Sequence, residues 1–183
     1  MERKINSEFL NKLEIEIRNK IAFAIENALS EDKYKKILEE EFKMRDIEKK
    51  RELSDQEVEQ FFPFRDQLNK ATVFVETITE ARRVMEILKF NTHSLLDTIA
   101  HENAHGNRAE QLGAKHLGYN FLIIKRNNGG LGVIPQASLY IPDEWDKETQ
   151  QAVLSEITWA PDDYGNEISE SDKRDLKHLH NKE

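Results

Sequence analysis

Apolar residues recur every three to four positions through the first sixty residues of the chain. Phe9 and Leu13 begin one such stripe, and this spacing is typical of a helix that buries one face. Ser30 and Ser54 each precede a further stripe and can cap a following helix. The helix after Ser54 is expected to be short and to end before Pro63. We therefore predict a helical N-terminal region over residues 1–62.

The pattern changes after residue 63, where β-branched and aromatic residues form short runs. Residues 71–75 and 119–125 have the composition of strands. Turn residues at 127–130 then lead into a returning strand over 131–141, with Pro135 at an edge or a bend. Helical spacing returns in four segments: 79–88, 92 toward 118, 147–158, and a last helix from about 169. The pattern predicts a mostly helical α+β fold with a second region at 63–183.

Composition narrows the class of protein. The 183 residues carry a formal net charge of −8 with both signs interspersed, so no concentrated basic face for nucleic acid is expected. No cysteine is present, which excludes disulfides and cysteine-based zinc sites or nucleophiles. Neither a signal peptide nor an apolar run long enough to span a membrane is visible, so we expect a cytoplasmic protein that does not bind membranes.

One five-residue motif carries recognisable chemistry. His101, Glu102 and His105 fit the pattern His-Glu-x-x-His within the helix predicted after residue 92. Positions i and i+4 lie on one helical face, so both imidazoles can reach one zinc ion. Glu102 follows the first histidine and can accept a proton from an attacking water molecule. The motif predicts a Zn²⁺ site with His101 and His105 as ligands and Glu102 as the catalytic base.

A zinc site of this kind needs a third protein ligand, and the same helix cannot supply it. Glu110 lies about 140° around the helix from the second histidine, and His116 lies about 16 Å along the axis from the motif. The third ligand must therefore come from a later segment. The carboxylate candidates there are Glu156, Asp172 and Asp175.

Residues 98–142 resemble the peptidase domain of the FtsH-type zinc proteases, which are linked to AAA+ ATPases. The order of motifs agrees: His-Glu-x-x-His after an apolar helix, the strand at 121–127, Leu-Gly-Val at 131–133, and the acidic stretch at 141–144. The resemblance implies a zincin-like peptidase fold and a peptide or protein substrate. The chain contains no P-loop motif, so we expect an ATP-independent peptidase without an ATPase module.

The resemblance also bears on the third ligand. In the FtsH-type family this ligand is an aspartate well downstream, followed by leucine or isoleucine. The segment 169–176 is the nearest match and places this role on Asp175, which precedes Leu176. Asp172 is the second choice because it lies one helical turn earlier on nearly the same face.

Three functions are therefore considered for the chain. The first is a zinc metallopeptidase, a hydrolase that cleaves peptide bonds and that holds an extended substrate by strand addition at residues 120–125 or 131–141. The second is a non-catalytic module with a metallopeptidase fold that keeps the metal for binding or regulation. The third is a helical interaction protein in which His-Glu-x-x-His occurs by chance. The N-terminal helices are a candidate surface for a protein partner.

Overall fold

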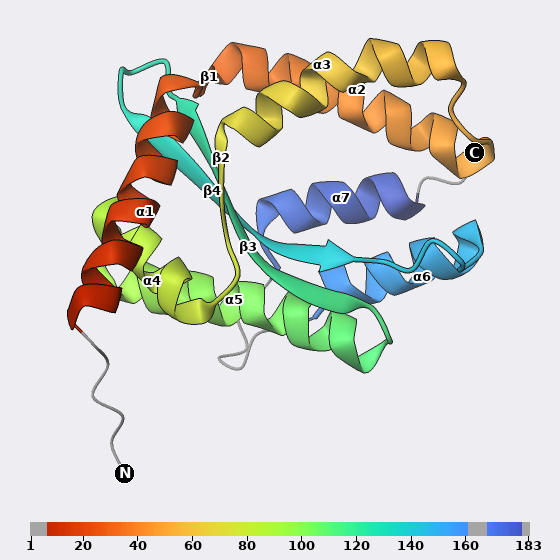
Figure 1. Ribbon diagram of the computed structural model, residues 1–183. Coiled ribbons are helices and arrows are strands. Elements are labelled where there is room, and N and C mark those ends of the chain that lie inside the picture. Colours follow the sequence, from red (N-terminus) through yellow and green to blue (C-terminus); the bar gives the residue numbers. More distant parts are fainter. Residues whose placement is uncertain (1–6, 161–167, 181–183) are drawn as a thin grey trace.

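The computed structural model describes residues 7–160 and 168–180 (Figure 1). The fold is α+β and mostly helical, as the pattern predicts. The elements follow one another in this order: α1 (Ser7–Glu26), β1 (Leu29–Ser30), α2 (Glu31–Lys50), α3 (Asp55–Lys70), β2 (Thr72–Val75), α4 (Ile78–Ile87), α5 (Thr92–Gln111), β3 (Lys115–Lys125), β4 (Leu131–Tyr140), α6 (Lys147–Thr158) and α7 (Glu170–His180). Within the described residues, no helix is long and apolar enough to cross a membrane.

Strand β3 is the centre of a small mixed sheet. β4 pairs with it antiparallel along its whole length. On the opposite side β3 pairs antiparallel with β2 and, near its end, parallel with β1. Among the strands that the structure describes, β4 therefore has one edge without a strand partner. Pro135 lies within β4, and an edge strand tolerates proline because one side of its backbone makes no ladder hydrogen bonds.

Helices cover both faces of this sheet (Figure 1). On one face, alternate β3 residues such as Phe121 and Ile123 pack against buried side chains of α1, α4 and α5. On the other face, Leu122 and Ile124 pack with Ile37 of α2 and with partly buried residues of α3. Helix α1 thus shares a core with the sheet, although it belongs to the region predicted at 1–62. The proposed region boundary at residue 62 falls within α3.

Two boundaries differ from the prediction. Helix α3 does not end before Pro63 but continues to Lys70 with the proline inside it. Phe61 is buried on one side of Pro63 and Phe64 packs on the other, so tertiary packing outweighs the missing backbone hydrogen bond. Helix α5 begins at Thr92 but ends at Gln111 instead of continuing toward residue 118, and Asn91 caps its start, because the Asn91 side chain accepts from the Ser94 N–H at 2.9 Å.

The predicted caps of two other helices are confirmed. The Ser30 side chain accepts from the Lys33 N–H at the start of α2. Ser54 and Glu57 form the expected capping box of α3. Arg51 pairs with the same Glu57 carboxylate, and the hydrogen bonds from Arg51 and Ser54 hold the pKa of Glu57 down at about 2. These local signals are independent of the sheet, which explains why they can be identified from short stretches of sequence.

Candidate metal centre

Helix α5 presents the His-Glu-x-x-His motif to the interior of the protein. Leu95, Ile99 and Ala109 are buried on the same helix and attach it to the rest of the fold. Within the described part of the chain, His105 and Glu102 are the two buried polar or charged residues, with 7% and 8% exposure. The motif therefore does not lie on a solvated helix surface, where chance histidines would be expected.

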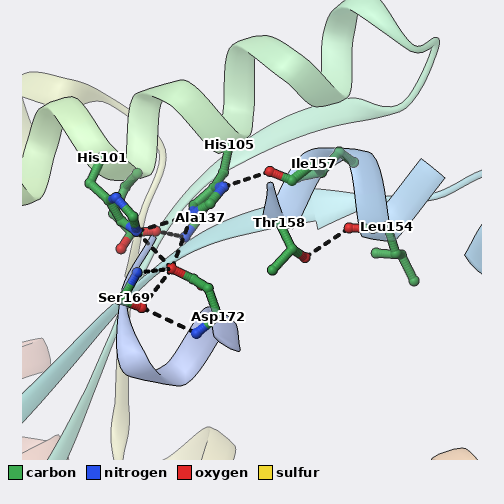
Figure 2. Close-up of polar contacts among 9 residues, drawn as sticks. His101, His105, Ala137, Leu154, Ile157, Thr158, Ser169 and Asp172 are labelled. Carbon is green, nitrogen blue, oxygen red and sulfur yellow. Dashed lines mark hydrogen bonds and ion pairs between the residues drawn. The ribbon is translucent and has the colours of Figure 1, made fainter. Parts of the chain in front are cut away.

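Three side chains converge between α5 and the start of α7 (Figure 2). His101 Nε2 lies 2.9 Å from Asp172 Oδ2, His105 Nε2 lies 3.7 Å from the same oxygen, and the two Nε2 atoms are 3.1 Å apart. These three residues form a group able to hold a metal ion among the residues that the structure describes. The cluster joins residues that are 71 positions apart in the chain.

The donor set and its spacing fit zinc. Ligand atoms bonded tetrahedrally to Zn²⁺ at about 2.0 to 2.1 Å lie roughly 3.3 Å from one another, and the three distances in the cluster fall on either side of that value. His105 Nδ1 lies 2.8 Å from the carbonyl oxygen of Ile157. Since a carbonyl only accepts hydrogen bonds, Nδ1 carries the proton and Nε2 keeps its lone pair for a metal.

The charge states of the cluster reflect its mutual contacts. Burial by itself would raise the pKa of Asp172, but the contacts with His101 and His105 and the hydrogen bonds from Ser169 outweigh it and hold that pKa well below its usual range. Burial would lower the pKa of His105, but the nearby Asp172 carboxylate and the hydrogen bond to the Ile157 carbonyl raise it above its ordinary value. Asp172 is therefore an anion, as a metal ligand must be.

Glu102 lies beside this cluster but points to the edge strand. Its Oε2 accepts a hydrogen bond from the Ala137 N–H of β4 at 2.6 Å. Burial raises the pKa of Glu102, and this effect outweighs the opposing influence of the two histidines and of Ala137. A carboxylate with a raised pKa, next to a cation site and a strand edge, is suited to accept and return a proton.

The start of α7 has a local reason to place Asp172 where it is. The Ser169 Oγ accepts from the Asp172 N–H at 3.2 Å, and Asp172 Oδ2 accepts from the Ser169 N–H at 2.9 Å. This reciprocal pair corresponds to a capping box with an acidic residue three positions after the serine. The Ser-x-x-Asp pattern at 169–172 is the sequence signal that would have favoured Asp172 over its neighbours.

Two predicted carboxylate candidates lie elsewhere. Asp175, the favoured third ligand, is one turn further along α7 and approaches Arg45 of α2, with 3.7 Å between Oδ1 and Nη1. Glu156 accepts from Arg108 at 2.7 Å and is mostly exposed. The structure thus brings Asp172 to the two imidazoles and does not bring Asp175 or Glu156 there. The physical reason is that the first turn of α7, which carries Asp172, lies beside the two histidines, whereas the second turn, which carries Asp175, lies beside α2.

Further contacts around α5 were not expected from the sequence. Tyr119 of β3 donates a hydrogen bond to the side-chain oxygen of Asn103, inside the motif. Gly106 lies so close to the His116 ring that a β-carbon at residue 106 would overlap it. His116 itself interacts with the Gly118 carbonyl, away from the cluster. The close approach of α5 to β3 therefore depends on a glycine directly after the second histidine.

Comparison with known proteins adds no name to this arrangement. No protein-family profile matches the chain, and neither a curated protein nor a solved structure matches it. The class that fold and site define is therefore an α+β protein with a candidate His-His-Asp metal centre.

Proposed function

We propose that the protein is a zinc metallopeptidase with a zincin-like catalytic arrangement, in which His101, His105 and Asp172 hold the metal. The observation that carries the proposal is the convergence of these three side chains next to the buried Glu102. A chance pair of histidines has no reason to meet a carboxylate from a helix 71 residues away. The hydrogen bond to the Ile157 carbonyl also fixes the tautomer of His105 that leaves Nε2 available to bind a metal ion.

Glu102 is assigned the role of general base and then general acid. A zinc ion held by the three ligands would polarise the peptide carbonyl and lower the pKa of the attacking water. Glu102 accepts the proton as the water oxygen bonds to the carbonyl carbon. It then donates that proton to the amide nitrogen as the carbon–nitrogen bond breaks, which gives a carboxylic acid and an amine. The remaining proton of the water passes from the acid to the amine, so the final products are a carboxylate and an ammonium group. Its raised pKa supports both steps.

The substrate is expected to be an extended peptide or a flexible protein segment lying along β4. Of the two strands considered for this role, β3 has partners on both sides whereas β4 has an edge without a described strand partner. Ala137 directs its N–H away from β3, toward Glu102. Strand addition at this edge would bring a peptide bond close to the catalytic carboxylate.

A zinc-titration and hydrolysis experiment tests the proposal. We expect about one zinc per chain, and loss of stoichiometric binding in His101→Ala and His105→Ala, because two remaining ligands hold zinc poorly. Glu102→Gln should retain zinc and lose hydrolysis of unfolded casein by at least about 100-fold. Glu110→Gln, on the same helix and exposed, is the matched control and should keep both properties.

Two outcomes would contradict the proposal. Protein that takes up no zinc at micromolar concentration would favour the alternative of a helical interaction protein. Zinc binding with no difference in hydrolysis between wild type and Glu102→Gln would favour a non-catalytic module that retains the metal. The non-catalytic module is supported by one observation, since the Glu102 carboxylate accepts a hydrogen bond from the Ala137 N–H.

A further inference from the structure

A cleft of about 270 Å³ opens beside the candidate metal centre. Helices α5, α6 and α7 and strand β4 form most of its wall, and α2 contributes Arg45. The proposed mechanism uses Glu102, His105 and Asp172 from this wall but gives no role to Arg45. Since α2 belongs to the N-terminal part of the chain, this contact also brings that part to the candidate active site.

Arg45 differs in charge from the other ionisable groups of the cleft. Among the described residues that line it, Arg45 is the one arginine or lysine, whereas Glu102, Asp172 and Asp175 are acidic. The protein as a whole carries a formal charge of −8, so an acidic substrate would be repelled elsewhere on its surface. A guanidinium in the cleft supplies the local attraction that such a substrate needs.

The guanidinium of Arg45 retains capacity to bind a further carboxylate. Its Nη1 lies 3.7 Å from Asp175 Oδ1 and its Nη2 lies 3.8 Å from Glu41 Oε2, and both distances exceed those of a hydrogen bond. The side chain is 50% exposed and lies over the ring of Phe42. Arginine can bind a carboxylate through two parallel N–H···O hydrogen bonds, and this interaction is stronger than the long ion pairs that Arg45 makes with Asp175 and Glu41.

The position of Arg45 sets which part of a substrate it can reach. Asp175 and the metal-centre residue Asp172 are three residues apart on α7, which is roughly 4.5 Å along the helix axis. The Arg45 Nη1 atom lies 3.7 Å from Asp175 Oδ1, so Arg45 is at most one ion-pair distance further from Asp172 than Asp175 is. An extended peptide advances about 3.3 Å per residue. Arg45 is thus within one to three residues of a peptide bond at the metal centre.

We propose that Arg45 is a specificity-determining residue that binds a carboxylate of the peptide substrate, within three residues of the cleaved bond. This inference rests on the proposed peptidase function. The carboxylate belongs either to an aspartate or glutamate side chain or to the C-terminus of the peptide, and both present the same planar acceptor to the guanidinium. Arg45 acts by positioning the substrate and takes no part in proton transfer.

The test uses internally quenched peptides of one parent sequence, each with a single glutamate moved along the chain, and matched peptides with glutamine in its place. A second pair has a free or an amidated C-terminus. We expect the preferred carboxylate peptide to exceed its neutral match at least about tenfold in kcat/KM, since a charge-assisted hydrogen bond is lost in the neutral peptide. Arg45→Gln should abolish this ratio and Arg45→Lys should retain part of it.

Arg65→Gln is the matched control. Arg65 has nearly the same exposure, 51%, and also pairs with Glu41, at 3.7 Å, but it does not line the cleft. This variant should keep the wild-type preference. A preference for glutamate over glutamine that depends on Arg45 shows that Arg45 binds an acidic side chain of the peptide. A preference for the free over the amidated C-terminus shows that Arg45 binds the terminal carboxylate. Equal rates for all charged and neutral pairs would overturn the inference while hydrolysis itself upholds the proposed function.

Binding separates the inference from the proposed function. Fluorescence anisotropy of the same peptides with zinc-loaded Glu102→Gln protein reports recognition without cleavage. If wild type hydrolyses nothing but the peptides bind in a manner that depends on their carboxylate and on Arg45, the proposed function fails and only the binding of a peptide carboxylate by Arg45 stands. If no peptide is hydrolysed and none binds with a carboxylate preference, both are wrong.

Discussion

The two helices that supply the candidate ligands are held in place by different forces. Helix α5 is anchored by buried apolar side chains, including Leu95 and Ile99, in the core cluster that covers one face of the sheet. Helix α7 has one residue, Leu176, among the buried hydrophobic residues of its described part, and it meets α5 through the polar contacts of Asp172. The α5 half of the site is therefore positioned by apolar packing, whereas the α7 half depends on the polar contacts of Asp172 with the two histidines.

Replacing Asp172 of α7 should have the largest effect on zinc binding. We expect Asp172→Asn to weaken zinc binding by more than about 100-fold, because loss of an outer partner alone costs about 10- to 100-fold. Asp175→Asn should change the affinity less than about twofold, since Asp175 contacts Arg45 instead. Competition titration with a chromophoric chelator measures both. Normal zinc affinity in Asp172→Asn and weakened affinity in Asp175→Asn would restore the ligand that the family resemblance favoured.

Glu156→Gln completes the series as a third carboxylate substitution. Glu156 pairs with Arg108 outside the cluster, so its replacement should leave zinc affinity unchanged. If all three carboxylate variants bind zinc as tightly as wild type, the α7 half of the site would have no part in metal binding.

Zinc binding should depend on pH, because His105 is both a candidate ligand and a titratable group. The raised pKa of His105 means that its protonated form stabilises the metal-free fold below about pH 6.5, and that this contribution is lost as pH rises through the raised pKa. Zinc must displace the proton from His105, so the zinc affinity should fall about tenfold for each unit by which the pH is lowered below this pKa, for each proton released. Calorimetry in buffers of different ionisation enthalpy gives the proton count. A constant affinity between pH 8 and pH 5.5 would exclude this competition.

The smallest effect is expected at the cap of α7. Ser169→Ala removes a side chain that bonds Asp172 at both the backbone and the carboxylate, and loss of such a cap costs about 1 kcal/mol. We expect roughly a fivefold loss of zinc affinity. At saturating zinc, the variant should hydrolyse the substrate at the wild-type rate, and this hydrolysis should still require Glu102. Ser169→Thr retains the hydroxyl and should restore the affinity. Equal zinc binding by the alanine and wild-type proteins would show that the cap does not position Asp172.

The parts of the fold that could be predicted from sequence share one property, which is that their signals are local. The helix containing His101 and His105 follows from apolar spacing, and the capping box at Ser54 follows from four adjacent residues. The continuation of α3 through Pro63 was not predicted, because packing of Phe61 and Phe64 decides it. The short strand β1 was also missed, since two residues carry no periodicity.

The candidate site divides in the same way. His101, Glu102 and His105 are brought to one helix by a spacing of four residues, and this spacing is a property of the chain itself. The choice among Asp172, Asp175 and Glu156 required the position of α7 relative to α5, which local sequence does not encode. Arg45 could not be predicted, because α2 is distant in sequence from the other elements that line the cleft and only tertiary packing brings them together.

The sequence by itself determined a mostly helical α+β chain with a His-Glu-x-x-His helix and a later carboxylate ligand still to be chosen. Helical periodicity and capping act over a few residues, so they can be read without knowledge of the fold. The tertiary structure decided that Asp172 meets the two imidazoles, that Glu102 bonds the edge strand, and that Arg45 lines the cleft. These contacts join segments separated by tens of residues, and the packing of helices on the two faces of one sheet sets their geometry.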